Sequence, residues 1–303
     1  MVYITTKEAA EKWNVSERTV RKYCDQGKIE GVIHAGSVWV IPSTAINPHE
    51  SNALQTEALP LVKKILSQRK KNNHYGLYEY IQVNLAYSSN RIASNRLTRD
   101  QVIEIYRTGK ISRQFEPLKV DDIVEIRNHF LACGYMMDTV MQPLSSAYIR
   151  TIHQKLFRAT QSDLDGRLHI GEYRKKANFY SSLVASIATE IDSLIKSYER
   201  KKNIGLEDIL DFHAQLELIH PFEDGNGRVG RMLMVKECLR HGIDPIIIDD
   251  KHRSDYNKGI AEWKDNHAIL LTVAEKVQKR FKDEKEVCDA LEFFRPPAGR
   301  GAR

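Results

Sequence analysis

The stretch from Ile219 to Arg231, IHPFEDGNGRVGR, separates two helical patterns and decides how the chain around it folds. Apolar residues recur at helical spacing as far as Ile219. His220 precedes a proline, a position that disfavours the α conformation, so the first helix should end there. The helical period resumes in RVGRMLMVKECL, from Arg228. Because glycine permits positive φ angles, the DGNG segment is typical of a turn. The sequence therefore predicts two helices joined by a glycine-rich turn.

This turn concentrates the groups that phosphate chemistry needs. It opens onto a helix N-terminus, whose free N–H groups and dipole favour an anion. Arg228 and Arg231 are three residues apart on that helix, close enough to contact neighbouring phosphates. Asp224 offers a carboxylate suited to Mg²⁺, and His220 can take a proton from a hydroxyl group. Phe222 supplies an apolar plug for the loop. We therefore expect the turn to hold a nucleoside triphosphate beside a general base.

The chain contains neither GxxxxGK[ST] nor GxGxxG after a strand, the two common phosphate-binding sequences. Instead, the stretch resembles the signature of the Fic family, HxFx[DE]GNGRxxR. The matching residues are His220, Phe222, Asp224, Gly225, Asn226, Gly227, Arg228 and Arg231. GEYRKKANFYSS (residues 171–182) is similar to the family's GxYR segment and to the flap that clamps a target peptide. IIIDDKHRSDYNKGIAEW (residues 246–263) is similar to a downstream family segment.

The resemblance covers residues 75–285 and implies a mainly α fold, a Fic helical bundle with a short β-hairpin flap. It implies transfer of AMP from ATP to a tyrosine, serine or threonine hydroxyl of a target protein, with release of pyrophosphate. His220 is then the general base, and Asp224 holds the Mg²⁺ cofactor. The residues implied to bind ATP are Gly225, Asn226 and Gly227 at the α- and β-phosphates, Arg228 and Arg231 at the β- and γ-phosphates, and Tyr256 near the adenine. Self-labelling of the chain is a further outcome that this chemistry allows.

Two other functions stay open from the sequence. The resemblance also allows transfer of UMP, phosphate or phosphocholine by the same site, since the family includes such activities and the nucleotide pocket decides the group. A transcription regulator can also use such a domain only to sense a nucleotide. His220 and Arg231 favour an enzyme, since a sensor has no need for a base.

SSNRIASNRLT (residues 88–98) resembles the inhibitory helix of many Fic proteins, [ST]xxxE[GN], whose glutamate contacts the second signature arginine. Ser89 fills the first position, but Ala93 replaces the glutamate and Ser94 follows it. A methyl group cannot pair with Arg231, so we expect a chain that does not inhibit itself. Removal of AMP, which relies on that glutamate, is not expected. A purely structural helix, or a glutamate replaced by design, are the other interpretations.

Residues 1–48 are predicted to form a small winged helix-turn-helix domain. Thr6 and Ser16 can cap two helices, Gly27 can end the second, and GVIHAGSVWVI predicts a hairpin. The pattern resembles small excisionase and MerR-type DNA-binding domains. The residues expected to face DNA are Ser16, Arg18, Thr19, Arg21 and Lys22. Six basic residues stand against five acidic ones here, so a solvated helix face is the alternative.

The remaining segments of the chain give the predicted domain boundaries. Residues 49–74 are predicted to be a basic helical linker, and residues 286–303 a disordered tail rich in proline, glycine and arginine. The net charge of +6 favours acidic partners only mildly. No apolar run is long enough to span a membrane, and the start of the chain lacks a signal-peptide pattern. The four cysteines form no CxxC pair, which indicates reduced thiols in a cytoplasmic protein.

Several residues in or near the signature are expected to have no catalytic role. His213 precedes His220 by seven residues on the same helix face and is expected to be a hydrogen-bonded structural histidine. His252 and His267 are expected at the surface, and Glu223 is expected to face solvent.

Overall fold

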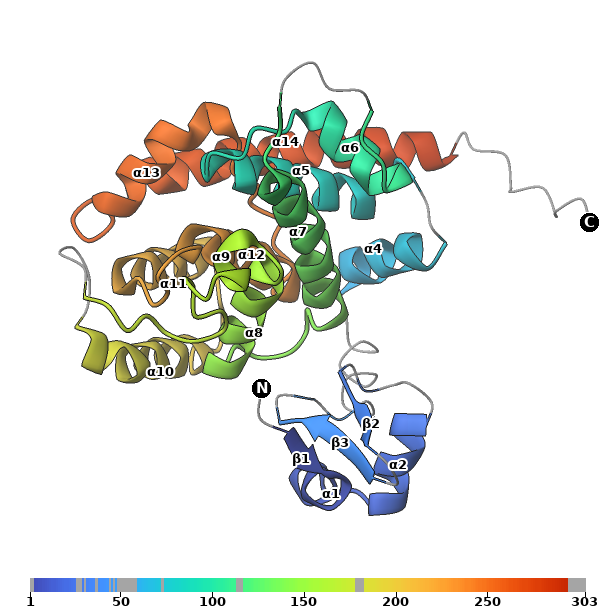
Figure 1. The fold of residues 1–303 in the computed structure, drawn as a ribbon. Coiled ribbons are helices and arrows are strands. Elements are labelled where there is room, and N and C mark those ends of the chain that lie inside the picture. Colours follow the sequence, from blue (N-terminus) through green and yellow to red (C-terminus); the bar gives the residue numbers. More distant parts are fainter. Residues whose placement is uncertain are drawn as a thin grey trace, which may run out of the picture. The chain divides into compact units, whose positions relative to one another are not determined.

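The chain forms two compact units in a computed structural model, one ending at Ala58 and the other beginning at Leu59 (Figure 1). The structure describes residues 3–25, 29, 31–35, 38–43, 45, 47, 59–71, 74–112, 117–177 and 183–293.

In its described residues, the first unit combines a three-stranded antiparallel sheet with two helices (Figure 1). Its elements are β1 (Tyr3–Thr5), α1 (Thr6–Trp13), α2 (Glu17–Asp25), β2 (Ile33–Ala35) and β3 (Val38–Pro42). The strand order is β1-β3-β2, with Ile4 opposite Ile41 and His34 opposite Trp39. The buried core residues are Ala9, Ala10, Trp13, Val20, Cys24, Ile29 and Ile41. The two predicted helices and the predicted hairpin are confirmed, and β1 is an additional strand.

The helix caps of this unit agree with the prediction for α2 but not for α1. Thr5, rather than Thr6, is the N-cap of α1, because pairing in β1 gives Thr5 the extended backbone that a cap needs. The Thr5 side chain accepts a hydrogen bond from the N–H of Glu8, whose carboxylate accepts one from the N–H of Thr5. Ser16 Oγ accepts from the N–H of Thr19 at 3.2 Å, as expected of a cap. Gly27 lies outside the described residues.

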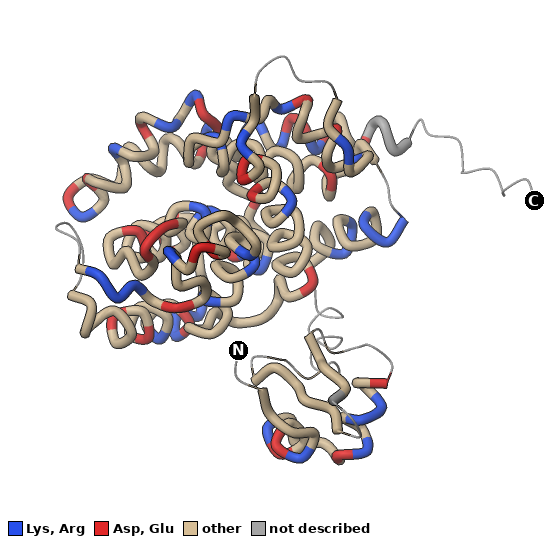
Figure 2. Tube along the Cα trace, viewed as in Figure 1, with Lys and Arg blue, Asp and Glu red and all other residues tan. Residues whose placement is uncertain are grey.

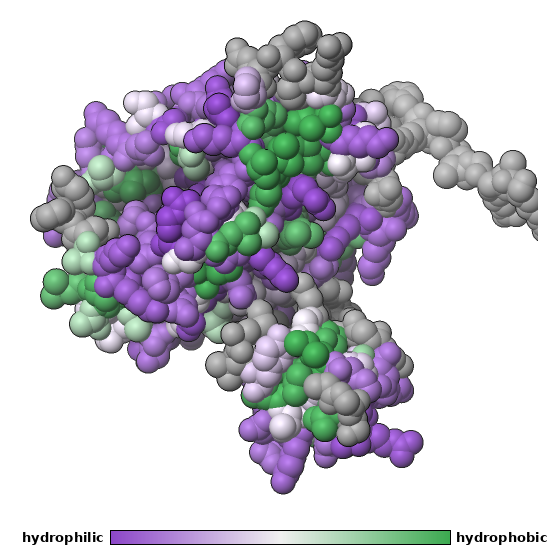
Figure 3. Space-filling model, in the orientation of Figure 1, coloured by the Kyte–Doolittle hydropathy of each residue, from purple (hydrophilic) through white to green (hydrophobic). Residues whose placement is uncertain are grey.

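The second unit is a bundle of helices (Figure 1). Its elements are α4 (Pro60–Lys70), α5 (Leu77–Ile92), α6 (Arg99–Thr108), α7 (Val120–Asp138), α8 (Ser146–Phe157), α9 (Gln161–Leu164), η1 (Val184–Ser186), α10 (Ile187–Glu199), α11 (Leu206–Ile219), α12 (Asn226–Arg240), η2 (Asp250–His252), α13 (Arg253–Ala261) and α14 (Ala268–Phe293). The predicted mainly helical fold is confirmed. Apolar side chains gather on the surface near α6 and α7 (Figure 3). Val102, Ile105 and Ile126 of these two helices belong to a buried apolar cluster.

Helix α12 is the centre of this unit. It packs against α4, α5, α7, α8 and α11, and nearly all of its residues are buried. Even its charged residues are enclosed: Lys236 and Glu237 form an ion pair at 2.6 Å with almost no exposed surface. Because neighbours cover every face of α12, its N-terminus has a fixed position, and the glycine-rich turn leads directly into it.

The second unit includes segments predicted to lie outside it. Val62, Ile65 and Gln68 of α4 are buried, so this part of the predicted linker is a packed helix. Helix α4 carries basic residues without acidic ones (Figure 2). Helix α14 continues past residue 285 to Phe293, into the predicted tail. Residues 49–58 of the predicted linker and residues 294–303 lie outside the described part of the chain.

The predicted hairpin flap is described only in part. Residues 171–177 contain no strand, and residues 178–182 lie outside the described residues, so the hairpin stays a prediction. None of the helices in the described ranges is both long enough and apolar enough to cross a membrane.

Candidate active site

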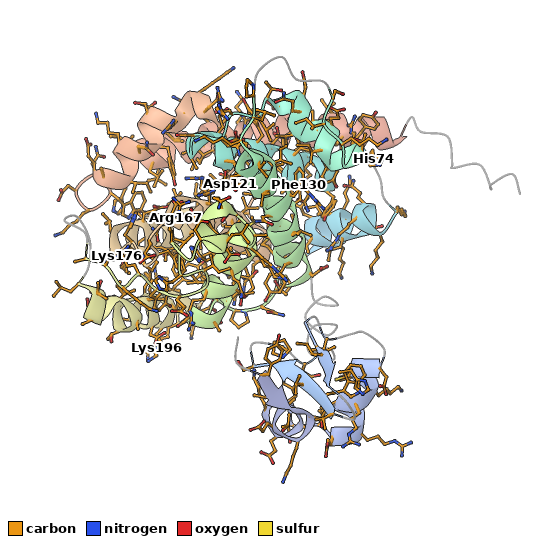
Figure 4. The ribbon with its side chains drawn as sticks, viewed as in Figure 1. His74, Asp121, Phe130, Arg167, Lys176 and Lys196 are labelled. Carbon is orange, nitrogen blue, oxygen red and sulfur yellow. The ribbon has the colours of Figure 1, made fainter. Side chains whose placement is uncertain are left out.

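His220 ends α11 and begins the glycine-rich turn. Its φ of 52° gives it the left-handed conformation at the C-cap of α11, which turns the chain before Pro221. Arg174 fixes this corner from a distant segment. Its Nε donates to the His220 carbonyl at 2.9 Å, and its backbone N–H donates to the Pro221 carbonyl at 2.8 Å. Its Nη1 donates to the carbonyl of Lys176, which is labelled in Figure 4. The buried Arg174 therefore sets the backbone position of the predicted base.

Phe222 and Asn226 close the turn. The Phe222 side chain is fully buried, as predicted for a plug. Asn226 Oδ1 accepts from the Phe222 N–H at 2.8 Å, and Asn226 Nδ2 donates to the Phe222 carbonyl at 2.9 Å. The side chain of Asn226 is thus occupied in shaping the turn. Its backbone N–H, in the first residue of α12, is the group we expect to contact a phosphate.

The glycines of the turn are there for space as well as conformation. Gly225 has a φ of 83° and is the N-cap of α12. A Cβ at Gly225 would lie 2.1 Å from Cε2 of Phe157, which is far inside contact distance. A Cβ at Gly227 would lie 2.8 Å from Nη1 of Arg231. A side chain at Gly225 would therefore collide with Phe157, and one at Gly227 would displace Arg231, which is predicted to contact phosphate.

His153 of α8 packs against the turn and bonds to its backbone. Its Nδ1 accepts from the Gly171 N–H at 2.9 Å, so Nε2 carries the proton and donates to the Asp224 carbonyl at 3.1 Å. Its ring stacks on Phe222, with centroids 3.9 Å apart and planes 4° from parallel. Burial lowers the pKa of His153 to about 4, so the ring is neutral at physiological pH.

Burial also lowers the pKa of His220 from its ordinary value. A hydrogen bond to the Glu217 backbone and the charge of Asp224 oppose this effect, while the charge of Arg174 adds to it. The net direction favours a neutral imidazole at neutral pH, which is the form that accepts a proton. His220 is half-buried, so its ring keeps contact with the surface.

Asp224 and Arg228 pair across the first turn of α12. Asp224 Oδ1 accepts from the Gly225 N–H at 2.6 Å, and Oδ2 accepts from Arg228 Nη2 at 3.1 Å. Arg228 is 4% exposed, lies 4.3 Å from the ring centroid of Phe157, and bonds through Nη1 to Glu125 at 2.7 Å. The Asp224 side chain, in contrast, is 65% exposed. An exposed carboxylate beside a helix N-terminus fits Mg²⁺, which commonly takes one or two protein carboxylates together with phosphate oxygens and water.

Arg231 reaches from α12 to α5. Its Nε donates to Ser89 Oγ and its Nη2 donates to the Ser89 carbonyl, both at 3.0 Å. Its Nη1 donates to the Tyr256 hydroxyl at 3.4 Å. Tyr256 is 3% exposed and also bonds to His213 Nε2 at 2.7 Å. The ring of Tyr256 therefore lies buried behind Arg231, and its predicted contact with adenine stays a prediction. His213 is buried and hydrogen-bonded, as predicted.

The segment that resembles the inhibitory helix contacts the second signature arginine through Ser89, which fills the first position of the family pattern. Ala93 is the exposed C-cap of α5, one helical turn after Ser89. Ser94 has a φ of 74°, a conformation that glycine and asparagine adopt most easily. The family pattern places one of these two residues at this position. The backbone of the altered segment thus keeps the turn although the side chains differ.

The remaining neighbours of the signature mostly follow the sequence predictions. His252 bonds to Asp249 at 2.7 Å, and His267 stacks on Trp263; both keep partial exposure at the surface. The prediction for Glu223 is wrong. Its side chain is only 13% exposed and pairs with His169 at 3.4 Å, because the turn folds it back toward the segment before Gly171.

On the first unit, α2 exposes most of the residues predicted to face DNA. The exposed ones are Ser16, Arg18, Arg21 and Lys22, while Thr19 is half-buried. Arg21 pairs with Glu17 at 2.8 Å. Arg18, Arg21 and Lys22 line a surface depression together with Glu17 and Asp25. The face is therefore accessible but mixed in charge.

Three residues of the site were missed by the sequence reasoning. Arg174 lies in the GxYR segment, so the resemblance pointed to it without giving it a role. His153 and Glu125 come from helices outside the signature, and the sequence analysis gave neither a role. Glu125 is 103 residues from Arg228 in the chain, so no local sequence pattern predicts their contact.

Comparisons with known proteins find similarity in both parts of the chain. The Fic/DOC family model matches residues 143–238, and a helix-turn-helix domain model matches residues 3–47. A protein adenylyltransferase Fic from Nematostella vectensis is 27% identical over 180 residues, which cover 56% of this chain and 40% of the relative. One from Drosophila persimilis is 26% identical over 209 residues, covering 66% of this chain and 39% of the relative. The chain thus spans about two fifths of the length of these curated relatives.

Solved structures share the fold. A Fic domain containing signaling protein from Bacteroides thetaiotaomicron matches with a TM-score of 0.61 and 19% identity, covering 79% of this chain and 99% of that one. Fic-1 from C. elegans matches with a TM-score of 0.59 and 19% identity, covering 80% of this chain and 75% of that one. Residues 143–238 thus match the Fic/DOC family model within a fold shared with solved Fic structures, and residues 3–47 match a helix-turn-helix domain model.

Proposed function

We propose that this chain is a protein adenylyltransferase, which transfers AMP from ATP to a tyrosine, serine or threonine hydroxyl of a target protein. The observation that carries the proposal is the corner between α11 and α12. There a half-buried imidazole with a lowered pKa, His220, precedes a glycine turn that leads into the N-terminus of a buried helix. The names of the relatives, protein adenylyltransferase, support the same reaction.

The proposed reaction uses His220 as the general base. His220 accepts the proton of the target hydroxyl while the hydroxyl oxygen forms a bond to the α-phosphorus of ATP. The bond from the α-phosphorus to the oxygen that bridges it to the β-phosphate breaks, and pyrophosphate leaves with that electron pair. The N–H groups at the start of α12 face the phosphates, and Arg228 and Arg231 neutralise their charge.

Asp224 is the residue that would hold Mg²⁺ in this reaction. Its exposed carboxylate fits the ion, which would supply positive charge between the phosphate oxygens when bound. Ala93 stands where the inhibitory glutamate would be. We therefore propose that the chain as given is active and does not need relief from self-inhibition.

The position of an isotope in ATP decides between the transfer reactions that this site allows. We expect the full chain with Mg²⁺ to transfer label from α-labelled ATP, to itself or to proteins of a host lysate, and not from γ-labelled ATP. Label from γ-labelled ATP would instead identify phosphate transfer, and label from α-labelled UTP alone would identify UMP transfer.

Matched histidine variants test the base. His220→Ala should abolish incorporation while ATP still binds, because the variant removes the proton acceptor and leaves the phosphate contacts. His267→Ala, at an exposed histidine before α14, should behave as the unmodified chain. Retained transfer by His220→Ala would remove His220 from the mechanism. Nucleotide binding by the unmodified chain without any transfer would favour the nucleotide sensor instead.

We also propose that the first unit binds duplex DNA through α2. The match to the helix-turn-helix domain model and the exposed Arg18 and Lys22 support this role. Contacts from such cations to phosphates predict binding that weakens steeply as salt rises, which a titration of labelled duplex at two salt concentrations measures.

A further inference from the structure

Glu125 of α7 contacts the predicted phosphate site through Arg228. Its Oε1 accepts from Arg228 Nη1 at 2.7 Å, and the Arg228 side chain is 5% exposed. The proposed transfer reaction gives Glu125 no role. A carboxylate on a phosphate-binding arginine can do one of two things: it can compete with the phosphate, or it can hold the arginine in place for it.

The two terminal nitrogens of the Arg228 guanidinium, its two arms, bond to different partners. Nη1 bonds to Glu125, whose side chain is 19% exposed, and Nη2 bonds to Asp224, whose side chain is 65% exposed. The Nη2 arm thus points toward the open side, where the cation and phosphates are expected. Glu125 occupies the other arm, on the enclosed side. A competing carboxylate would occupy the arm that faces the phosphates, so this arrangement favours a holding role.

Glu125 is itself held by the segment that follows Ala93. Asn95 is 3% exposed, and its Nδ2 donates to Glu125 Oε2 at 3.1 Å. The same Nδ2 donates to the Asp122 carbonyl at 2.9 Å, and Oδ1 accepts from the Leu97 N–H at 3.1 Å. The amide of Asn95 is therefore fixed in orientation on both sides. Its donor is aimed at Glu125, which requires an acceptor there.

We infer that Glu125 is a positioning residue that holds Arg228 by one arm, so that the other arm is aimed at the β- and γ-phosphates of ATP. The inference rests on the proposed function. The altered segment then supports both signature arginines, since Ser89 contacts Arg231 directly and Asn95 orders Arg228 through Glu125. If Asp224 held Mg²⁺ instead of Nη2, Glu125 would still hold the guanidinium of Arg228 through Nη1.

The test compares Glu125→Gln with Glu275→Gln, at an exposed position on α14. Glutamine keeps the length but offers one acceptor oxygen to two donors, Arg228 Nη1 and Asn95 Nδ2. We expect the Kd for MgATP, measured by calorimetry on the full chain, to rise about tenfold, the scale of one charged hydrogen bond. The Kd for AMP should not change, since AMP lacks the phosphates that Arg228 contacts. Glu275→Gln should change neither value.

Other results overturn the inference. A lower Kd for MgATP in Glu125→Gln would identify a competitor, and equal weakening for MgATP and AMP would identify a general structural role. An Arg228→Gln background adds a second measurement, because Glu125→Gln should have no further effect on MgATP once the arginine is gone. Absence of nucleotide binding by the unmodified chain would refute the proposed function itself, whereas normal binding that Glu125→Gln leaves unchanged refutes this inference alone.

Discussion

His129 shows how a single buried side chain links the phosphate site to the stability of the fold. It is fully buried, and its two ring nitrogens have no hydrogen-bond partner within the described residues. Burial, together with the charges of Arg228 and Arg231, lowers its pKa to about 3. The ring therefore stays neutral in the folded chain down to about pH 3, whereas the unfolded chain binds a proton there below about pH 6.5.

This difference predicts the pH dependence of stability. Below its ordinary pKa of about 6.5, the unfolded chain binds a proton at His129 that the folded chain does not, so stability falls as pH falls from about 6.5 toward 3. At pH 5 the loss is about 2 kcal/mol at most. His129→Leu removes it, so the melting temperature should fall less between pH 7 and pH 5 than in the unmodified chain. Calorimetry at both pH values measures this, and identical falls would contradict it.

At the scale of elements, the junction of α11 and α12 is where the sequence was most informative. Proline restricts the backbone before it and glycine permits the positive φ angles of a turn, so the end of α11, the turn and the start of α12 could all be predicted from Ile219 to Arg231. The side-chain partners could not. Arg174 and Glu125 reach the junction from distant segments, and such contacts depend on how helices pack rather than on any local pattern. The strand β1 escaped notice because it is three residues long and pairs with β3 across most of the first unit.

Gly225→Ala tests how strictly the turn determines the start of α12. A Cβ there is strained at a φ of 83° and clashes with Phe157, so we expect a loss of about 2 to 4 kcal/mol in stability and weaker MgATP binding. Gly205→Ala is the matched control. Gly205 is also a helix N-cap, but its φ is −103° and its nearest neighbour to an added Cβ is 3.8 Å away. Similar melting temperatures for the two variants would contradict the prediction.

The C-terminal end of α5 carries the prediction about inhibition. Ala93 lies one turn after Ser89, which contacts Arg231, so a glutamate at position 93 would project on the same side of the helix. We expect Ala93→Glu to lower incorporation from α-labelled ATP at least tenfold. Ala93→Gln, of equal length but uncharged, should lower it much less. Equal incorporation by Ala93→Glu and the unmodified chain would show that the missing glutamate is not what keeps this chain active.

At the scale of the whole molecule, the two units have separate cores and separate proposed roles. The sequence predicted this division because a winged helix-turn-helix pattern and the Fic signature occupy different parts of the chain. The position of the boundary was less accessible. Helix α4 reads as a basic linker, and only the burial of Val62 and Ile65 shows that it belongs to the second unit.

Separate roles predict separable variants. Arg18→Ala combined with Lys22→Ala should weaken binding to duplex DNA and reduce its salt dependence by about two phosphate contacts. Lys7→Ala, at an exposed lysine of α1, serves as the charge control. None of these changes should alter incorporation from α-labelled ATP. Unchanged DNA binding by the double variant would assign α2 a solvated face and no more.

Because all four cysteines are buried, their reaction with an alkylating reagent can report when each unit unfolds. Cys24 lies in the core of the first unit, and Cys133, Cys238 and Cys288 lie in the second. Burial raises the pKa of Cys133 to about 12, so this thiol is unreactive while its surroundings stay intact. Pulse alkylation during a slow denaturant ramp, read by mass spectrometry, should therefore tag Cys24 when the first unit unfolds and Cys133 when the second unit unfolds. The order of tagging would rank the two cores by resistance, with no probe added to the chain.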